Sequence, residues 1–336
     1  MTWGGDRKGP LVGGVPPTLK PDEKSTNQGV PASGEPWTPI LLTRWSGHYL
    51  SEKGIDSGRL DAELILAHVL GLGRLDLYLQ HDRPLLPEEL AAFKALLKRR
   101  GVREPLQHVL GTAPFRELDL RSDSRALIPR PETEVLVGEI LTWAVGAQKR
   151  YSSGPPPESD TAPDPKTLTA LDIGTGTGAI SLSLLKEGPF RQVVGTDLSG
   201  KALDVARENA MDSGLSESLE LREGHLFDPV RAGERFHVVA SNPPYVPEGD
   251  RDGLSPEVRD WEPPSALFAG PEGLDVLLPL IRGVPDALVP GGLLALEVGD
   301  GQATRVARAV EETGAFSEIR IRPDLAGRER VVLGVA

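Results

Sequence analysis

The chain has 336 residues, of which 39% are hydrophobic and 26% charged, which is room for roughly two domains with packed cores. It contains no cysteine, so disulfides, zinc fingers, iron–sulfur clusters and thiol catalysis are excluded, and a formal net charge of -12 disfavours non-specific binding to nucleic acid phosphates. The six histidines show no metal-ligand spacing, the N-terminus has no apolar signal segment and no apolar run approaches the ~20 residues of a membrane helix, so we expect a cytoplasmic protein without a metal.

The N-terminal third is predicted to contain a leader and a helical domain. Residues 1–39 are rich in Gly and Pro and lack apolar periodicity, which predicts a disordered leader. Folding is expected to begin at Thr38, a helix N-cap that is followed by proline at the first helical position. Apolar residues then recur at helical spacing in four stretches, which begin near positions 39, 57, 76 and 87. Residues 40–110 are therefore predicted to form a small helical domain.

The segment that follows combines a hairpin, a helix and a polar insertion. Residues 111–130 alternate apolar and turn residues, which predicts a hairpin that links two domains. A helix is expected over residues 132–143. Residues 146–167 are poor in apolar residues and rich in Pro, Ser and charge, which favours an exposed, mobile or disordered insertion.

From Leu168 onwards, short apolar runs alternate with helical patterns. The apolar runs are 168–173, 192–196, 237–241, 293–298 and 330–335, and the helices between them are expected over 178–186, 201–212, 274–288 and 302–312. Strands that alternate with helices imply an α/β domain, here residues 131–336, with a parallel, doubly wound sheet. Ligands in that architecture bind beyond the carboxyl ends of the strands.

A glycine-rich loop, Gly174-Thr175-Gly176-Thr177-Gly178, stands where the first of these strands turns into a helix. Glycine permits the tight-turn dihedrals and the close approach of a ligand that such a loop needs. Asp197 ends the next strand, about 20 residues further on, where an acid accepts hydrogen bonds from ribose hydroxyls. The loop also fits a dinucleotide fingerprint, but Asp172 would put a carboxylate near a bound phosphate, which disfavours a pyrophosphate. The choice of cofactor therefore needs a second motif.

That second motif is Asn242-Pro243-Pro244-Tyr245, in which a buried strand ends abruptly. The prolines cannot continue the ladder and fix the backbone, so the Asn242 side chain and the Pro243 carbonyl are expected to offer two oxygen acceptors to one NH2 group. Tyr245 is expected to offer a flat face to a planar group. An amide or base nitrogen is a weak nucleophile, and two acceptors that hold its hydrogens direct its lone pair at an electrophilic methyl group. The segment predicts methyl transfer to a planar nitrogen.

Together these motifs resemble a known family. LDIGTGTGAISLSLL, GTDLS and SNPPYVPE are similar to the class I S-adenosylmethionine-dependent methyltransferases that modify planar nitrogens, and within them to the HemK-type release-factor glutamine methyltransferases. The likeness runs from about Leu42 to Val335 and is interrupted at 146–167; it includes DAELILAHVLG, LIPRPETEVLV and EPPSALFAGPEGLD. It implies a Rossmann-like methyltransferase sheet with a small N-terminal all-α domain that docks the substrate.

The resemblance also implies which residues act. Gly174 to Gly178 would wrap the methionine part of S-adenosylmethionine, and Asp197 would hold its ribose. Leu226 would pack on the adenine ring. The substrate amide would be clasped by Asn242, Pro243, Pro244 and Tyr245. The pocket would be closed by Phe115 and by Pro129-Arg130-Pro131-Glu132-Thr133.

Two positions depart from the family pattern. His225 stands where an acid usually contacts adenine, and Pro264 stands where an arginine commonly follows Glu-Pro. Neither belongs to the methyl-transfer core. Arg130 could instead have a purely structural role, in an ion pair with Glu132 or Glu134.

The expected function is methyl transfer from S-adenosyl-L-methionine to the side-chain amide nitrogen (N5) of the glutamine in the GGQ motif of peptide-chain release factors. The enzyme is expected to be a monomer without membrane or direct nucleic acid partners. Methylation of a ribosomal-protein glutamine is the nearest alternative. An N6-adenine DNA or RNA methyltransferase would use the same Asn-Pro-Pro-Tyr segment, but the net charge of -12 disfavours it. A non-enzymatic protein on a decayed methyltransferase fold is disfavoured by the intact glycine loop, Asp197 and Asn242.

Overall fold

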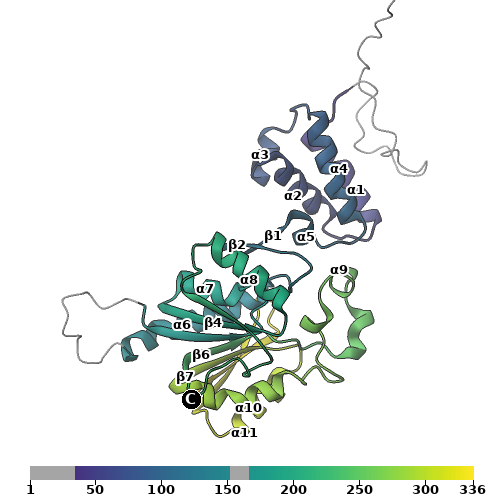
Figure 1. Cartoon of the computed structure of the whole chain (residues 1–336). Coiled ribbons are helices and arrows are strands. Elements are labelled where there is room, and N and C mark those ends of the chain that lie inside the picture. Colours follow the sequence, from purple (N-terminus) through teal and green to yellow (C-terminus); the bar gives the residue numbers. More distant parts are fainter. Residues whose placement is uncertain (1–34, 152–165) are drawn as a thin grey trace, which may run out of the picture. The chain divides into compact units, whose positions relative to one another are not determined.

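The computed structural model describes residues 35–151 and 166–336 (Figure 1). Most of the predicted leader and most of the predicted insertion lie outside these ranges. The chain divides into two compact units, one that ends at Leu110 and one that runs from Gly111 to Ala336. No helix within the described ranges is long and apolar enough to cross a membrane.

The first unit is a set of helices packed around an apolar core. The helices are α1 (Pro39–Glu52), α2 (Gly58–Leu70), α3 (Arg74–Leu79), α4 (Pro87–Gly101) and α5 (Leu106–Leu110). The first four confirm the sequence prediction, and Thr38 is the N-cap of α1 as expected. The short α5 was not predicted. Leu50, Leu66 and Phe93 are fully buried where these helices meet.

The leader was predicted to end at residue 39, but the folded helical unit begins before that position. Trp37 is only 9% exposed, and its ring packs edge-on against that of Trp45, with 6.1 Å between the ring centroids. Its carbonyl accepts a hydrogen bond from the Leu85 amide at 2.8 Å. Burial of a large indole stabilises this contact, so Trp37 belongs to the core of the helical unit.

The second unit is built on a seven-stranded sheet of order β5-β4-β3-β6-β7-β9-β8. The strands are β3 (Leu168–Ile173), β4 (Phe190–Asp197), β5 (Leu219–Glu223), β6 (Phe236–Ser241), β7 (Leu288–Glu297), β8 (Glu318–Pro323) and β9 (Glu329–Val335). In this order, the first five strands (β5, β4, β3, β6 and β7) pair in parallel, whereas β9 is antiparallel to both β7 and β8. The predicted parallel sheet is confirmed for β3 to β7, whereas β9 is antiparallel to its neighbours, because only a short loop joins β8 to β9 and a parallel pair needs a crossover.

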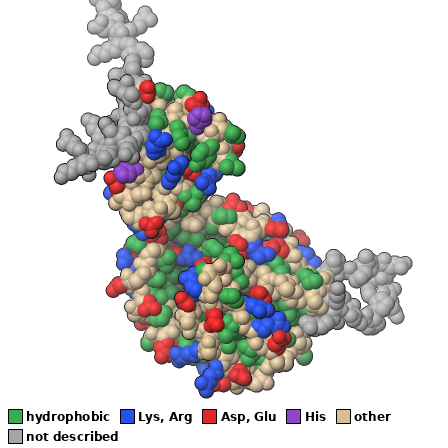
Figure 2. All heavy atoms as spheres, turned by 180° about the vertical axis from the view of Figure 1, so that it is seen from behind, with side chains coloured by type: hydrophobic (Ala, Val, Ile, Leu, Met, Phe, Trp, Pro, Cys, Tyr) green, Lys and Arg blue, Asp and Glu red, His purple; other side chains and the backbone are tan. Residues whose placement is uncertain are grey.

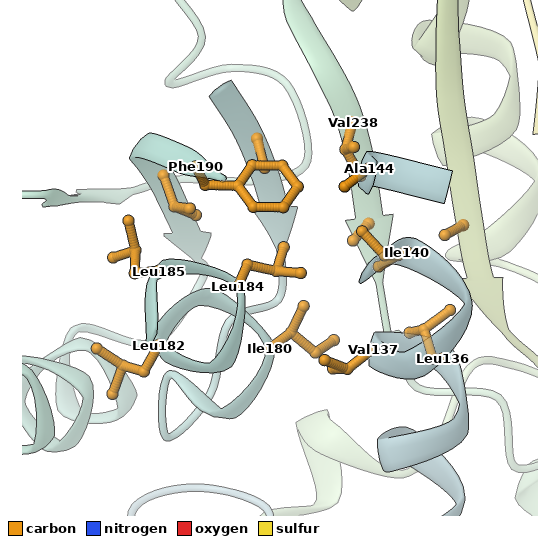
Figure 3. Packing of buried hydrophobic residues seen from close by; sticks show 14 of the residues in the cluster. Leu136, Val137, Ile140, Ala144, Ile180, Leu182, Leu184, Leu185, Phe190 and Val238 are labelled. Atoms are coloured by element: carbon orange, nitrogen blue, oxygen red, sulfur yellow. The ribbon is translucent and has the colours of Figure 1, made fainter. Parts of the chain in front are cut away.

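Helices cover both faces of this sheet (Figure 1). One face carries α6 (Pro131–Tyr151), α7 (Ala179–Glu187) and α8 (Gly200–Asp212), and the other carries α10 (Leu277–Ala287) and α11 (Ala303–Glu312). Strand side chains alternate between the two cores, so Leu168 and Ala170 of β3 face α7 while Leu171 faces α10. Figure 3 shows the first core, where side chains of α6 and α7 meet Phe190 and Val238.

Two segments outside the sheet differ from the sequence prediction. Helix α6 was expected to end near Trp143, but it continues to Tyr151 because Ala144 and Ala147 extend its buried face. The predicted hairpin is present as β1 (Thr112–Phe115) and β2 (Leu118–Arg121), and it belongs to the second unit. The backbone amide of Arg121 donates to the side-chain oxygen of Asn209 on α8 at 2.7 Å. The hairpin is therefore anchored to a helix that covers the sheet.

Candidate active site

A cavity of about 480 Å³ opens at the carboxyl ends of β3, β4, β5 and β6. This is the edge at which parallel sheets bind ligands, and the volume falls in the range of small-molecule sites. Of the predicted site residues, the following line the cavity: Gly174, Thr175, Gly176, Thr177, Asp197, Leu226, Asn242, Pro243 and Pro244. Gly178, Tyr245 and Phe115 are not among the lining residues. The wall is completed by residues 125–130 and Thr133, from the end of the hairpin segment and the first turn of α6.

The glycine loop forms the floor of the cavity. Gly174, Gly176 and Gly178 have φ angles of 73°, 56° and 84°, in the left-handed region that favours glycine. A Cβ atom at Gly174 or Gly176 would meet no other atom within 4 Å, so the loop leaves open space above these two positions. At Gly178 a Cβ would lie 3.2 Å from Leu182, so this glycine serves the packing of α7 and not the cavity.

Asp172 lies beneath the glycine loop and not in the cavity wall. Its side chain follows Leu168 and Ala170 on the α7 side of β3 and is fully buried. Its Oδ2 atom accepts hydrogen bonds from the Thr175 hydroxyl at 2.7 Å and from the amide and hydroxyl of Ser181 at 3.2 and 2.7 Å. Burial raises the pKa of Asp172 to about 6, against these hydrogen bonds. The prediction that this carboxylate lies beside a bound ligand is therefore wrong: it holds the loop from below.

Asp197 joins the loop after β3 to the loop after β4. Its Oδ2 atom accepts a hydrogen bond from the Gly176 amide and its Oδ1 atom accepts one from the Ser199 amide, both at 2.9 Å. Partial burial raises the pKa of this carboxyl group. Each carboxylate oxygen can accept more than one hydrogen bond, so the cavity side of Asp197 retains acceptors for hydroxyl groups.

Asn242 is held by a buried chain of hydrogen bonds. Its Nδ2 atom donates to the Thr133 hydroxyl at 3.0 Å, and that hydroxyl donates to Oε2 of Glu297 at 2.6 Å. The Tyr245 hydroxyl donates to the other carboxylate oxygen, Oε1, at 3.2 Å. Thr133 is 4% exposed and Glu297, at the end of β7, is 0% exposed. Because Nδ2 has a partner in the protein, Oδ1 is the atom of the Asn242 amide that remains to accept a hydrogen bond in the cavity.

Tyr245 supports Glu297 and is not among the residues that line the cavity. Its ring packs with the core under α10 and α11, and a Cβ atom added at Gly299 would lie 3.2 Å from it. Its carbonyl accepts a hydrogen bond from Gln302 at 3.0 Å. Burial and the nearby Glu297 carboxylate raise the pKa of the Tyr245 hydroxyl. The ring is partly buried against this core, and its predicted flat face toward the substrate stays a prediction.

Phe115 and Leu226, both predicted to line the pocket, have different places. Phe115 is 1% exposed and packs with Leu120 and Leu136 in the core on the α6 side, so its predicted role in closing the pocket is wrong. Leu226 does line the cavity, and it has a φ of 46°. This conformation costs a residue with a side chain roughly 1–2 kcal/mol, and such strain is typical of ligand-binding sites.

Glu297 was missed by the sequence analysis, and Thr133 was named only as part of a pocket-closing segment. A signal for Glu297 exists, since it is an acid at the end of the apolar run LLALEV, where a strand reaches the ligand-binding edge. Thr133 gives no signal by itself, because its role depends on contacts 109 and 164 positions away. No group of three or more His, Asp or Glu that could hold a metal occurs among the residues that the structure describes.

Comparison with known proteins gives these motifs a family. Residues 42–111 match the model of the PrmC N-terminal domain, and residues 160–254 match that of the methyltransferase small domain. A release factor glutamine methyltransferase of Geobacter sulfurreducens is 41% identical over 300 residues, which are 89% of this chain and 97% of the relative. Relatives of the same name from Deinococcus radiodurans and Rhodopirellula baltica are 41% and 37% identical over 87% and 88% of this chain and 96% of each relative.

The chain belongs to the release factor glutamine methyltransferase family. This confirms the resemblance drawn from the sequence motifs, and it makes the chain a methyltransferase with a methyltransferase sheet and a PrmC-type helical domain.

In this member of the release factor glutamine methyltransferase family, the two departures from the family pattern lie at the cavity. His225 lines it beside Leu226. Pro264 begins a short 3-10 helix, η2 (Pro264–Ala266), whose Ser265 and Ala266 are also in the wall. His225 therefore belongs to the lining of the site and Pro264 stands next to it, and neither is among the hydrogen-bond partners of Asn242.

Arg130 pairs with an acid that the sequence did not indicate. The expected partners were Glu132 and Glu134, but the guanidinium contacts Glu262, whose side chain is 0% exposed. Glu262 also accepts a hydrogen bond from the Ile128 amide at 3.2 Å, and burial raises the pKa of its carboxyl group despite Arg130. This pair fixes the segment before α6 to the loop that follows the Asn-Pro-Pro-Tyr motif.

Proposed function

We propose that this chain transfers a methyl group from S-adenosyl-L-methionine to the side-chain amide nitrogen of a glutamine in peptide-chain release factors. The observation that carries the proposal is Asn242, whose amide nitrogen is bound to Thr133 and whose oxygen is left to accept from a substrate. An acceptor at this point suits an NH2 group. The names of the relatives supply the substrate, and the GGQ glutamine of release factors is the residue that we expect to be methylated.

The residues of the cavity fit S-adenosylmethionine. The open space above Gly174 and Gly176 would accommodate its methionine part, and Asp197 would accept hydrogen bonds from its ribose. Leu226 supplies an apolar surface for a purine ring. When bound, this cofactor supplies a methyl group on a positively charged sulfur.

The protein's part in the reaction is to hold and orient the substrate nitrogen. The Asn242 oxygen and the Pro243 carbonyl would accept the two hydrogens of the amide, which directs the nitrogen lone pair away from both acceptors. The nitrogen becomes acidic once it is alkylated, so its extra proton can leave to water without a side-chain base beside Asn242. Alignment and oriented dipoles would supply the rate enhancement.

The helical unit is proposed to dock the release factor. Leu75 and Leu79 of α3 are each 80% exposed, and Val102 and Leu86 are also exposed. Figure 2 shows hydrophobic side chains at the surface of this unit among charged ones. Leu75 and Leu79 stand four positions apart on one face of α3. An exposed apolar patch is typical of a protein–protein contact, and a release factor is the partner that the proposed reaction requires.

The test is an incubation with methyl-labelled S-adenosylmethionine and a purified release factor. Label is expected at the GGQ glutamine, and a release factor in which that glutamine is replaced by alanine is the matched control. Parallel reactions with ribosomal protein, DNA and RNA test the alternatives. Label in the control release factor or in nucleic acid, with none at the glutamine, would contradict the proposal.

A further inference from the structure

We propose that Thr133 and Glu297 are positioning residues that fix the orientation of the Asn242 amide, and thereby make the site select a primary amide over a carboxylate. The proposal rests on the proposed function, since it concerns the same substrate nitrogen. It is carried by one chain of contacts, from Asn242 Nδ2 to the Thr133 hydroxyl (3.0 Å) and from that hydroxyl to Glu297 (2.6 Å).

The direction of this chain follows from what each group can do. In its ionised form the Glu297 side chain only accepts hydrogen bonds, so it takes the single hydroxyl hydrogen of Thr133. The Thr133 oxygen can then only accept from Asn242, and the NH2 end of the asparagine amide is the end that donates. The reversed amide would put two acceptors, Oδ1 and the Thr133 oxygen, against each other. Glu297 thus sets the orientation of Asn242 through Thr133.

Burial makes this orientation firm. Glu297 and Thr133 are 0% and 4% exposed, so water does not replace a lost partner at either group. The Tyr245 hydroxyl donates to the second oxygen of Glu297, which keeps the carboxylate from turning toward other donors. Thr133 belongs to α6, Tyr245 to the loop that follows β6, and Glu297 to the end of β7. The chain of hydrogen bonds therefore also fixes these three elements at the site.

The orientation has a consequence for selectivity. With Oδ1 in the cavity, a glutamine side chain meets an acceptor for its NH2 group, whereas a glutamate side chain meets an oxygen that repels it. With the amide reversed, the cavity would present NH2, and the preference between the two side chains would be lost or inverted. A glutamate peptide therefore reports on the orientation separately from catalysis.

The experiment compares Thr133→Val, which removes the hydroxyl at nearly constant volume, with Thr133→Ser, which keeps it. Methylation of release factor is followed as kcat and KM, cofactor affinity by calorimetry, and inhibition by two peptides that carry glutamine or glutamate at the reactive position. Thr133→Val is expected to lower kcat about tenfold or more, the effect of one lost oriented hydrogen bond. It is also expected to reduce the preference for the glutamine peptide over the glutamate peptide by a similar factor. Thr133→Ser is expected to keep both kcat and this preference near wild type. Cofactor affinity should stay within about twofold of wild type in both variants.

A second pair keeps the test decisive if Thr133→Val does not fold. Glu297→Leu removes the acceptor of the Thr133 hydroxyl, so it should lower kcat and the preference for the glutamine peptide as Thr133→Val does. Glu297→Gln keeps an oxygen that can accept from this hydroxyl, so it should retain most of both. A folded Thr133→Val or Glu297→Leu enzyme with unchanged kcat and unchanged peptide preference would overturn the positioning role alone. Absence of glutamine methylation by the wild-type enzyme would instead overturn the proposed function, and this inference with it.

Discussion

At the scale of single residues, Asn242 is the point at which the cavity meets the buried interior. Its amide nitrogen belongs to the chain that ends at Glu297, and its oxygen belongs to the site. Removing the side chain therefore affects the reaction centre without touching the glycine loop or Asp197, which lie on neighbouring strands. This separation makes binding of cofactor and turnover independently measurable.

We expect Asn242→Ala to bind S-adenosylmethionine normally and to lose turnover by about 10²–10³, the typical cost of one transition-state hydrogen bond. Asn242→Asp should not recover activity, because a carboxylate cannot donate to Thr133 and would stand near the buried Glu297. Calorimetry and methyl transfer to release factor measure the two effects. Joint loss of cofactor affinity and thermal stability would show that Asn242 only caps the strand end.

Asp197 should control cofactor affinity. Asp197→Ala removes the acceptor proposed for the ribose and also frees the Gly176 and Ser199 amides that it now binds at 2.9 Å. We expect S-adenosylmethionine binding to weaken by roughly 1.5–3 kcal/mol, the scale of hydrogen bonds to a charged group. Calorimetry checks this against Asn242→Ala, whose affinity should be unchanged. Equal affinities for Asp197→Ala and wild type would remove Asp197 from the site.

Glu297 should make the stability of the fold depend on pH. Burial raises its pKa to about 7 in the folded protein, helped by Glu132 and opposed by Thr133, Tyr245 and Arg330. The folded state then binds more protons than the unfolded state between about pH 4.5 and 7, so this contribution is present below that window and is lost as pH rises through it. Its size is on the order of 3 kcal/mol.

The measurement is the free energy of unfolding from urea titrations at pH 5 and pH 8, for wild type and Glu297→Gln. Glutamine does not titrate, so the fall in stability between the two pH values should be smaller in the variant. The fully buried Asp172, with a pKa raised to about 6, adds a fall of the same sign in both proteins. An identical pH dependence in the two proteins would show that Glu297 is not titrating in this range.

At the scale of elements, the sequence predicts strands better where they are buried on both faces than where they lie at an edge. β3, β6 and β7 are nearly continuous apolar runs and were predicted within a few residues, apart from the start of β7. The edge strands β5 (Leu219–Glu223) and β8 (Glu318–Pro323) were missed, because their partly exposed side chains are mostly charged. The direction of β9 was also missed, since an apolar run carries no information on direction.

The site was predictable where its residues stand in a short continuous motif directly after a strand. The glycine loop, Asp197 and Asn242 each follow a strand directly, and parallel topology brings those strand ends together. Thr133, Tyr245 and Glu297 could not be assigned in the same way, because their roles come from side-chain contacts between α6, the loop after β6 and β7. Tyr245 shows the difference: the motif was recognised, but the contact of its hydroxyl with Glu297 was not.

The glycine loop offers a matched comparison within one element. Gly174→Ala and Gly178→Ala both place a side chain at a positive φ and should each cost roughly 1–2 kcal/mol of stability. Only Gly178→Ala also meets close neighbours, Leu182 at 3.2 Å and Ala206 at 3.4 Å, so it should lower Tm more. Gly174→Ala projects into the open floor of the cavity and should weaken cofactor binding more. The opposite ranking of cofactor affinities would place the ligand elsewhere.

At the scale of the whole molecule, the chain joins a unit with an apolar helical core to a unit that holds every residue of the proposed site. The described residues of the first unit have their own buried cluster, and the two cores of the sheet draw no residue from it. The site residues all lie between Arg125 and Glu297. Binding of cofactor and recognition of an intact release factor can therefore be divided between the two units.

A chain of residues 111–336 should keep wild-type affinity for S-adenosylmethionine, because the cavity and both sheet cores remain complete. It begins before β1, so the hairpin and its hydrogen bond from Arg121 to Asn209 are retained. Methylation of intact release factor should fall by at least tenfold through KM, since the exposed Leu75 and Leu79 are lost with the docking unit. A short glutamine peptide, which lacks the rest of the release factor and so any surface for docking, should be methylated equally by the truncated and full-length enzymes. Normal methylation of intact release factor by the truncated chain would show that docking occurs on the methyltransferase unit itself.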